Sequence, residues 1–136
     1  MRLHRNIATL LTVAATAEDQ TGSTYQVLPA SEDAVQDGDH GIQVYFGLTQ
    51  SGGATSPTAQ AKLQTSLDKT NWIDVVSSTQ LAADGSKYET KDATNASVPL
   101  LTYVRAVTVL AGGTKPSHTA DVRLVASAPF RLKKVA

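Results

Sequence analysis

The sequence predicts an all-β protein, an antiparallel, jelly-roll-like β-sandwich of six to eight strands with extended termini. Apolar and polar residues alternate in several short segments, which is the period of a half-buried strand. Clusters of Gly, Pro, Asn, Asp and Ser separate these segments, as turns and loops do. Charged residues make up 18% and aromatic residues 5% of the chain, a poor match to a helical bundle, which carries more Leu, Glu and Lys. The length of 136 residues fits a single domain over residues 1–136.

The first strands are predicted on either side of an acidic loop. Residues 23–28, STYQVL, form a short strand candidate, and residues 31–41 form a loop with four acids and no apolar periodicity. In residues 42–49, IQVYFGLT, apolar side chains alternate with polar or small ones, so this segment is a clear half-buried strand. Residues 51–58, SGGATSPT, follow as a flexible loop.

A hairpin is predicted around the only tryptophan of the chain. Residues 60–67 alternate, and residues 68–71, DKTN, make a turn because Asp and Asn side chains bond nearby backbone amides. The return strand begins at Trp72. We expect this ring to be a core plug that covers the open end of the sandwich, since burial of an aromatic residue removes on the order of 200 Å² from water. The alternative is a platform on which a ligand stacks.

The second half of the chain holds the most apolar segment. Residues 82–99 are mostly loop, with one short strand around SKYET. Residues 100–113, LLTYVRAVTVLAGG, are apolar on both faces, which predicts a central strand covered on both sides. Residues 118–128 alternate again up to Pro129.

One charge interrupts the apolar strand at residues 100–113. A lone Arg105 in such a strand needs an acceptor or a path to solvent along its stem. Asp74 and Asp121 are the leading candidates for its partner.

The charges divide the chain into an acidic body and two basic ends. All twelve acids lie between Glu18 and Asp121, whereas five of the twelve basic residues lie within the first five and last six positions. The first twenty residues have the order of a secretory signal, but Thr9 and Thr12 interrupt its apolar part. We therefore favour a structural N-terminal arm over residues 1–17, either helix or strand, and a C-terminal arm over residues 129–136.

The motifs do not predict an enzyme, a cofactor or a metal centre. The three histidines are far apart, and no GxSxG, GxxxxGK[ST] or GxGxxG pattern occurs. Ser117, His118 and Asp121 are close in sequence but lack the setting of a catalytic triad. The best cluster for a hard cation, residues 37–40, lacks the later ligands of a calcium loop. Asn95 begins a short glycosylation sequon of a kind that occurs often by chance.

Membranes and nucleic acids are not predicted partners either. No apolar run approaches the roughly 18 residues that a membrane span needs. The aromatic residues do not interleave with a basic stripe, so specific nucleic-acid readout is not expected. The chain has no cysteine, which agrees with synthesis in a cytoplasm.

Two segments resemble a known kind of protein. LQTSLDKTNWIDV, residues 63–75, and YVRAVTV, residues 103–109, resemble the hairpin and Tyr-Val-Arg strand of small β-sandwich structural proteins of tailed bacteriophages, including capsid decoration or cement proteins. They are also similar to part of discoidin-type sandwiches that bind carbohydrate or lipid, in which such a hairpin and an Arg-bearing strand pack together in the core. Discoidin-type domains are usually longer and carry aromatic loop tips, which the loops at residues 31–41 and 51–58 lack.

The resemblance implies a virion structural protein, made in the host cytoplasm, that stabilises the phage head by bridging capsid subunits. Its expected partners are the major capsid protein and further copies of itself. The alternatives are another head or tail component or a carbohydrate-binding module. Apolar groups that accompany basic ones at the chain ends predict the partner interface. These candidate interface residues are Arg2, Leu3, Arg5, Ile7, Phe130, Arg131, Leu132, Lys133 and Lys134.

Overall fold

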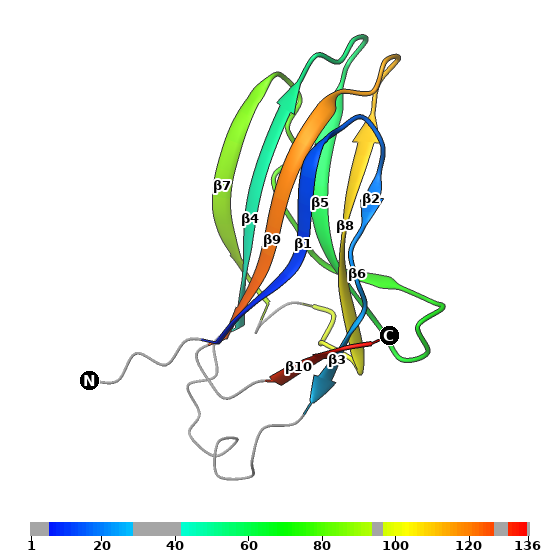
Figure 1. Ribbon diagram of the computed structural model, residues 1–136, viewed down its shortest axis with the longest axis vertical. Coiled ribbons are helices and arrows are strands. Elements are labelled where there is room, and N and C mark those ends of the chain that lie inside the picture. The colour runs from blue at the N-terminus through cyan, green and yellow to red at the C-terminus, as the bar shows by residue number, and fades with distance from the viewer. Residues whose placement is uncertain (1–5, 29–41, 94–96, 127–130, 136) are drawn as a thin grey trace, which may run out of the picture.

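The computed structural model describes residues 6–28, 42–93, 97–126 and 131–135, and they form two antiparallel sheets without a helix (Figure 1). The first sheet has four strands in the order β1-β9-β4-β7. They are β1 (Asn6–Thr16), β9 (Ser117–Ala126), β4 (Ile42–Ser51) and β7 (Gly85–Asp92). The second sheet has six strands, of which five lie in the order β10-β3-β8-β5-β6, while β2 also pairs with β8. They are β10 (Arg131–Lys134), β3 (Tyr25–Leu28), β8 (Tyr103–Ala111), β5 (Thr58–Ser66), β6 (Ile73–Ser77) and β2 (Gln20–Thr21).

The prediction of an all-β sandwich is confirmed, with ten strands in the described part rather than six to eight. The additional strands come from the first half and the end of the chain. The N-terminal segment, for which helix and strand were both open, is strand β1. The two-residue strand β2 and the four-residue strand β10 are too short to show a period in the sequence.

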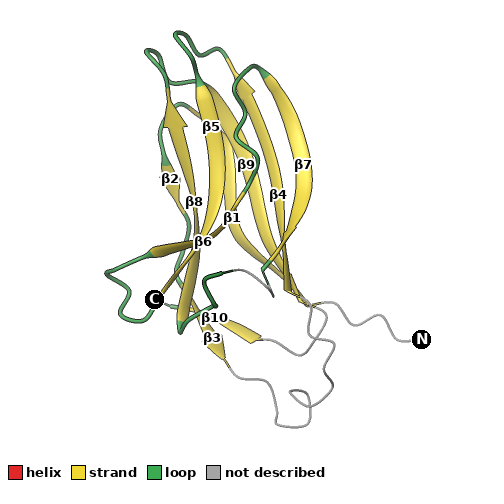
Figure 2. Cartoon of the chain, turned by 180° about the vertical axis from the view of Figure 1, so that it is seen from behind, coloured by secondary structure: helices red, strands yellow, loops and turns green. Residues whose placement is uncertain are grey.

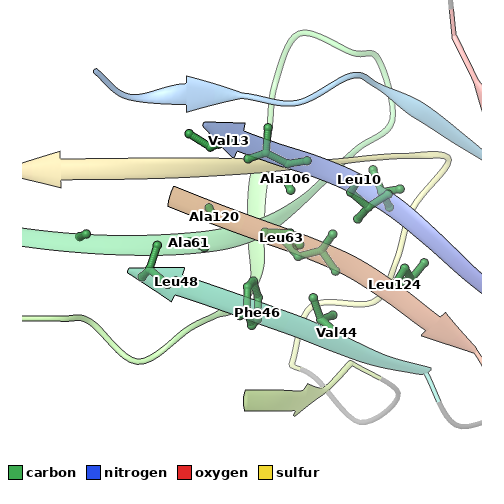
Figure 3. Close-up of a cluster of buried hydrophobic side chains, with 14 of the residues drawn as sticks. Leu10, Val13, Val44, Phe46, Leu48, Ala61, Leu63, Ala106, Ala120 and Leu124 are labelled. Carbon is green, nitrogen blue, oxygen red and sulfur yellow. The ribbon is translucent and has the colours of Figure 1, made fainter. Parts of the chain in front are cut away.

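Period-two side chains from both sheets fill the core (Figure 3). The buried residues of β4 and β9 face those of β5 and β8 in the other sheet, and the largest of them is Phe46. Most of the others are small or branched: Val44, Leu48, Ala59, Ala61, Leu63, Val104, Ala106, Ala120, Val122 and Leu124. Small side chains allow the two sheets to approach closely. Because side chains alternate between the faces of a strand, the outward positions of the same strands are free for polar groups.

Strand β8 is covered on one side only, contrary to the expectation for residues 100–113. Val104 and Ala106 are fully buried against the other sheet, whereas Arg105 and Tyr103 are half-buried and Val109 is 41% exposed. The outward face of β8 is apolar at Val107, where neighbouring strands of the same sheet shield the side chain. A valine-rich strand at the centre of a sheet therefore does not need a layer on each face.

A buried histidine joins the two sheets. Nδ1 of His118 lies 2.8 Å from the carbonyl oxygen of Thr16. Because a carbonyl oxygen can only accept a hydrogen bond, Nδ1 carries the proton and donates it. Nε2 is then the acceptor for the hydroxyl of Thr108 in the other sheet, at 2.8 Å. The same hydroxyl oxygen accepts the backbone N–H of Gln20 at 3.1 Å. His118 is thus a satisfied core residue and not part of a catalytic triad.

Truncation of a core leucine is expected to cost far more than truncation of an exposed one nearby. Leu63 is fully buried and Leu67, four residues on, is 67% exposed. Leu63→Ala should lower the free energy of unfolding by about 2–5 kcal/mol because it leaves a cavity. The control Leu67→Ala should change it by less than about 0.5 kcal/mol. Urea unfolding measures both; equal losses would contradict the burial of Leu63 in the core.

Candidate interaction surfaces

The predicted interface residues divide between described strands and segments outside the description. Arg2, Leu3, Arg5 and Phe130 lie outside the described residues. Ile7 lies in β1 and is 58% exposed. The other four belong to β10, which pairs with β3 through Arg131↔Leu28, Leu132↔Val27, Lys133↔Gln26 and Lys134↔Tyr25.

Where they are described, both predicted arms are edge strands of the sandwich. Strand β1 ends the four-stranded sheet and β10 ends the other. Leu10, Leu11 and Val13 are buried in the core, so residues 6–16 belong to the sandwich rather than to a projecting arm. Leu132 packs against the core. Lys133 and Lys134 are exposed.

Trp72 is not a core plug, and that prediction is wrong. The ring is half-buried and lies outside the buried core cluster. Its face is covered by the guanidinium of Arg105, whose Cζ is 4.2 Å from the ring centroid. Its Nε1 donates a 3.3 Å hydrogen bond to the carbonyl oxygen of Lys69. The ring is aimed back over the preceding strand, as expected, but over the outer face of the sheet.

Arg105 is held by an amide rather than by an acid. Its Nε donates to Oε1 of Gln64 at 2.9 Å, and Nε2 of Gln64 donates to Oδ1 of Asp74 at 2.9 Å. Lys62 adds a 3.1 Å ion pair with Asp74 to this series of contacts. The hydrogen bond from Gln64, and then the contact with Lys62, hold the pKa of Asp74 below its usual value against partial burial. The expected partner Asp74 is thus reached through Gln64, whereas Asp121 pairs with Arg123 in the other sheet.

The register aligns the C-terminal strand with this cluster. Lys133 lies opposite Gln26, Gln26 opposite Tyr103, and Tyr103 opposite Ser66. Cross-strand partners share one face of a sheet. The neighbours Leu132, Val27 and Val104 point toward the core, so this row points outward. Nζ of Lys69, from the turn between β5 and β6, lies 5.3 Å from the centroid of the Tyr103 ring.

We call this outward surface of the six-stranded sheet the basic face. Four cations on strands β5, β8 and β10 and on the β5–β6 turn contribute to it, together with the aromatic rings of Trp72 and Tyr103 and the carboxylate of Asp74. The cations are Lys62, Lys69, Arg105 and Lys133. In the views of Figures 1 and 2, which look along one axis from opposite sides, the β5–β6 turn projects next to the C-terminal end of β10.

Sequence reasoning singled out Trp72, Arg105 and Asp74, but it did not assign them, or Lys62 and Lys69, to an interface. The alternation of residues 60–67 already placed Lys62 and Gln64 on the polar side of one strand. What joins them to Arg105 and Lys133 is the pairing of β5 with β8 and of β10 with β3. The β3–β10 pairing joins residues more than a hundred positions apart and leaves no local pattern in the sequence.

The turn that carries Lys69 is organised by one carboxylate. Oδ1 of Asp68 accepts the backbone N–H groups of Thr70 and Asn71 at 2.9 and 2.8 Å and the hydroxyl of Ser66 at 3.0 Å. Oδ2 accepts the side-chain amide of Asn71 at 2.7 Å. The N–H groups of Asn71 and then Thr70 hold the pKa of Asp68 well below its usual range. Lys69 takes a left-handed backbone conformation, φ 65°, at the centre of the turn.

The described residues show no cluster of metal-binding side chains. They contain no group of three or more His, Cys, Asp or Glu that fits a metal ion. The cluster at residues 37–40 and the sequon residue Asn95 lie outside the described residues. Within residues 6–28, 42–93, 97–126 and 131–135, no helix is long and apolar enough to cross a membrane.

The comparisons with known proteins identify no family. No model of a protein family matches the chain, and the search of curated proteins finds no significant relative.

The turn at Asp68 should lose its contribution to stability in acid. A carboxylate whose pKa is lowered by folding stabilises the fold above its ordinary pKa of 3.8, and this contribution disappears as the pH falls through the lowered folded value. Asp68→Ala should therefore lower the urea midpoint at about pH 7, and the difference from wild type should shrink steadily below about pH 4. Asp84→Ala, in the exposed turn before β7, is the control. A difference that does not depend on pH would contradict the role of the carboxylate.

The Arg105–Trp72 contact should be visible in fluorescence, because Trp72 is the only tryptophan. Arg105→Ala uncovers one face of the ring, so the emission should shift to longer wavelength and acrylamide quenching should rise. Arg123→Ala, on the other sheet, should leave the spectrum unchanged. Removal of the ring itself, Trp72→Ala, should cost about 1–2 kcal/mol, less than loss of a core aromatic. An unchanged spectrum in Arg105→Ala would show that the stack does not exist in solution.

Proposed function

We propose that this chain is a structural protein of a tailed-phage particle that decorates and cements the capsid. It binds the major capsid protein where subunits meet, is made in the host cytoplasm and resides in the virion. Its action is the burial of surface between subunits, repeated over many copies, and needs no active site. The resemblance of residues 63–75 and 103–109 to such proteins is the starting point for this proposal.

The basic face is the observation that carries the proposal. Lys69 and Arg105 lie over the rings of Tyr103 and Trp72 on an outward surface of the six-stranded sheet that also carries Lys62 and Lys133. Its carboxylates are already engaged, Asp74 by Lys62 and Gln64 and Asp68 by the N–H groups of its own turn. Arginine and aromatic residues are enriched in the centres of protein interfaces. A surface of this composition fits an acidic protein surface, where charge guides docking and the rings supply buried area.

The two segments that carry the resemblance also form this surface together. Residues 63–66 of β5 pair with residues 103–106 of β8, and Trp72 closes over Arg105. The similarity to discoidin-type sandwiches implied that such a hairpin and an Arg-bearing strand pack together in the core. Here the packing is on the outer face, where a partner has access to it.

Strand β1 supports the expectation of a homo-oligomer. It is an edge strand of 11 residues, and its sequence NIATLLTVAAT has no charged residue. The opposite edge, β7, carries Lys87, Glu89, Lys91 and Asp92, which is the usual protection against unwanted strand pairing. One carbonyl of β1, that of Thr9, accepts the hydroxyl of Tyr25 at 3.1 Å. A second copy would add along the uncharged edge rather than along β7, away from the carbonyl groups of Thr9 and Leu10, which lie against Tyr25 and Gly22.

The copy number in purified particles tests the role. Particles from the phage that encodes the chain are purified by density gradient, and the chain and the major capsid protein are quantified by mass spectrometry. A cement protein is expected in numbers comparable to the major capsid protein. A few copies in each particle would indicate a head-completion or tail component instead, and absence from particles would overturn the proposal.

Charge reversal tests whether the basic face is the surface that binds. Lys69→Glu with Lys133→Glu should abolish rebinding to particles stripped of the chain, and rebinding of the wild type should weaken as salt rises. Lys87→Glu, on the exposed edge strand β7, is the matched control and should rebind normally. Normal rebinding of the double variant would move the interface away from this face.

A further inference from the structure

Two tyrosine rings lie over a glycine on the outer face of the four-stranded sheet. A Cβ atom at Gly47 would be 3.0 Å from the hydroxyl of Tyr45 and 3.2 Å from Cδ1 of Tyr88. Gly47 and Tyr88 are cross-strand partners in β4 and β7. Both rings therefore rest close to the backbone of residue 47, and this approach requires a residue without a side chain. We call Tyr45, Gly47 and Tyr88 the tyrosine platform.

The platform is open to solvent. Tyr88 is 66% exposed, the second-highest exposure among the large apolar and aromatic residues of the described part, after Leu67. Tyr45 is half-buried. The ring of Tyr88 gains nothing from the core, but it covers the backbone at Gly47, a contact that can stabilise the sheet. Two adjacent rings over one glycine also form a flat aromatic surface that solvent reaches.

The polar groups around the rings are already fixed by contacts with one another. Nε of Arg123, opposite Tyr45, is 3.1 Å from each carboxylate oxygen of Asp121. Gln43 donates to Asp92 at 3.4 Å. The hydroxyls of Thr49 and Thr119 share a 2.5 Å hydrogen bond. These groups present fixed donors and acceptors without an excess of positive charge, in contrast to the basic face.

We propose that the tyrosine platform is a binding site for a neutral saccharide of pyranose rings. The C–H groups on one face of such a ring pack on the electron-rich face of an aromatic side chain. Its hydroxyls then meet the fixed polar groups around Tyr45. Two rings of this size offer at most a few hundred Å², well below the roughly 800 Å² per partner of a stable protein interface. An anionic ligand is disfavoured, because Arg123 is held by Asp121.

This site is separate from the proposed docking of the basic face, since the two lie on the outward surfaces of different sheets. A chain bound to a shell through the six-stranded sheet leaves the tyrosine platform exposed. Saccharide binding neither requires nor excludes the cement role, so failure of one proposal does not decide the other.

The test is an NMR titration of the ¹⁵N-labelled chain with cellohexaose and with chitohexaose. At least one of them should shift the backbone amides of Gly47, Tyr88 and Arg123 with a Kd of about 1 mM, as expected for a small shallow contact. The amides of Arg105 and Tyr103, on the other sheet, serve as the internal reference and should not move. If neither saccharide shifts the platform amides at about 10 mM, or if the shifts gather around Trp72, the proposal is wrong.

Variants separate binding from a purely structural role. Tyr88→Ala should weaken the affinity by about tenfold, whereas Tyr88→Phe should retain it within about threefold because the stacking ring remains. Tyr103→Ala removes a tyrosine from the basic face and should bind the saccharide like the wild type. A loss of thermal stability in Tyr88→Ala without any saccharide response in the wild type would show that the rings serve only to cover Gly47.

Discussion

The constraint on which the rest of the structure depends is the register of two strand pairs, β5 with β8 and β4 with β9. Each pair is continuous, over Thr58–Ser66 and Ile42–Ser51. Because side chains alternate between the faces of a sheet, a slip of one residue would turn Leu63 or Phe46 outward and bury their polar neighbours. Burial of Phe46, Leu63, Val104 and Val122 fixes the register, and the hydrogen bonds of His118 to Thr16 and Thr108 fix how one sheet lies on the other.

The same register builds the two outward surfaces. The period that buries Leu63 exposes Lys62 and Gln64, and their partners across the ladder are Val107 and Arg105. On the other sheet it places Tyr88 beside Gly47. The molecule therefore presents a cationic, aromatic surface on one sheet and a charge-paired, tyrosine-bearing surface on the other. Their different chemistry is the basis for assigning a protein partner to one and a saccharide to the other.

Local patterns predicted the strands but not their neighbours. The alternation in residues 42–49 and 60–67 and the DKTN turn at residues 68–71 were sufficient for β4, β5 and the β5–β6 hairpin. Trp72 was wrongly assigned to the core. The sequence shows where the turn lies, but not on which face of the sheet the residue after the turn is placed. The register shift in the β5–β6 pair between Leu63 and Gln64 affects that placement. The partner of Arg105 was predicted as an acid, whereas the amide of Gln64 lies directly opposite. The basic face depends on pairing between β3 and β10, which no spacing in the sequence reveals.

The central claim is that β4, β5, β8 and β9 form one cooperative unit that positions both surfaces. Native-state hydrogen exchange measures this most directly, since it reports the free energy of opening for each amide. The slowest amides of all four strands should exchange with one common free energy, equal to that of global unfolding, while those of β3 and β10 exchange through smaller local openings. Exchange of β5 and β8 at a distinctly lower free energy than β4 and β9 would contradict the claim, because the two sheets would then open independently.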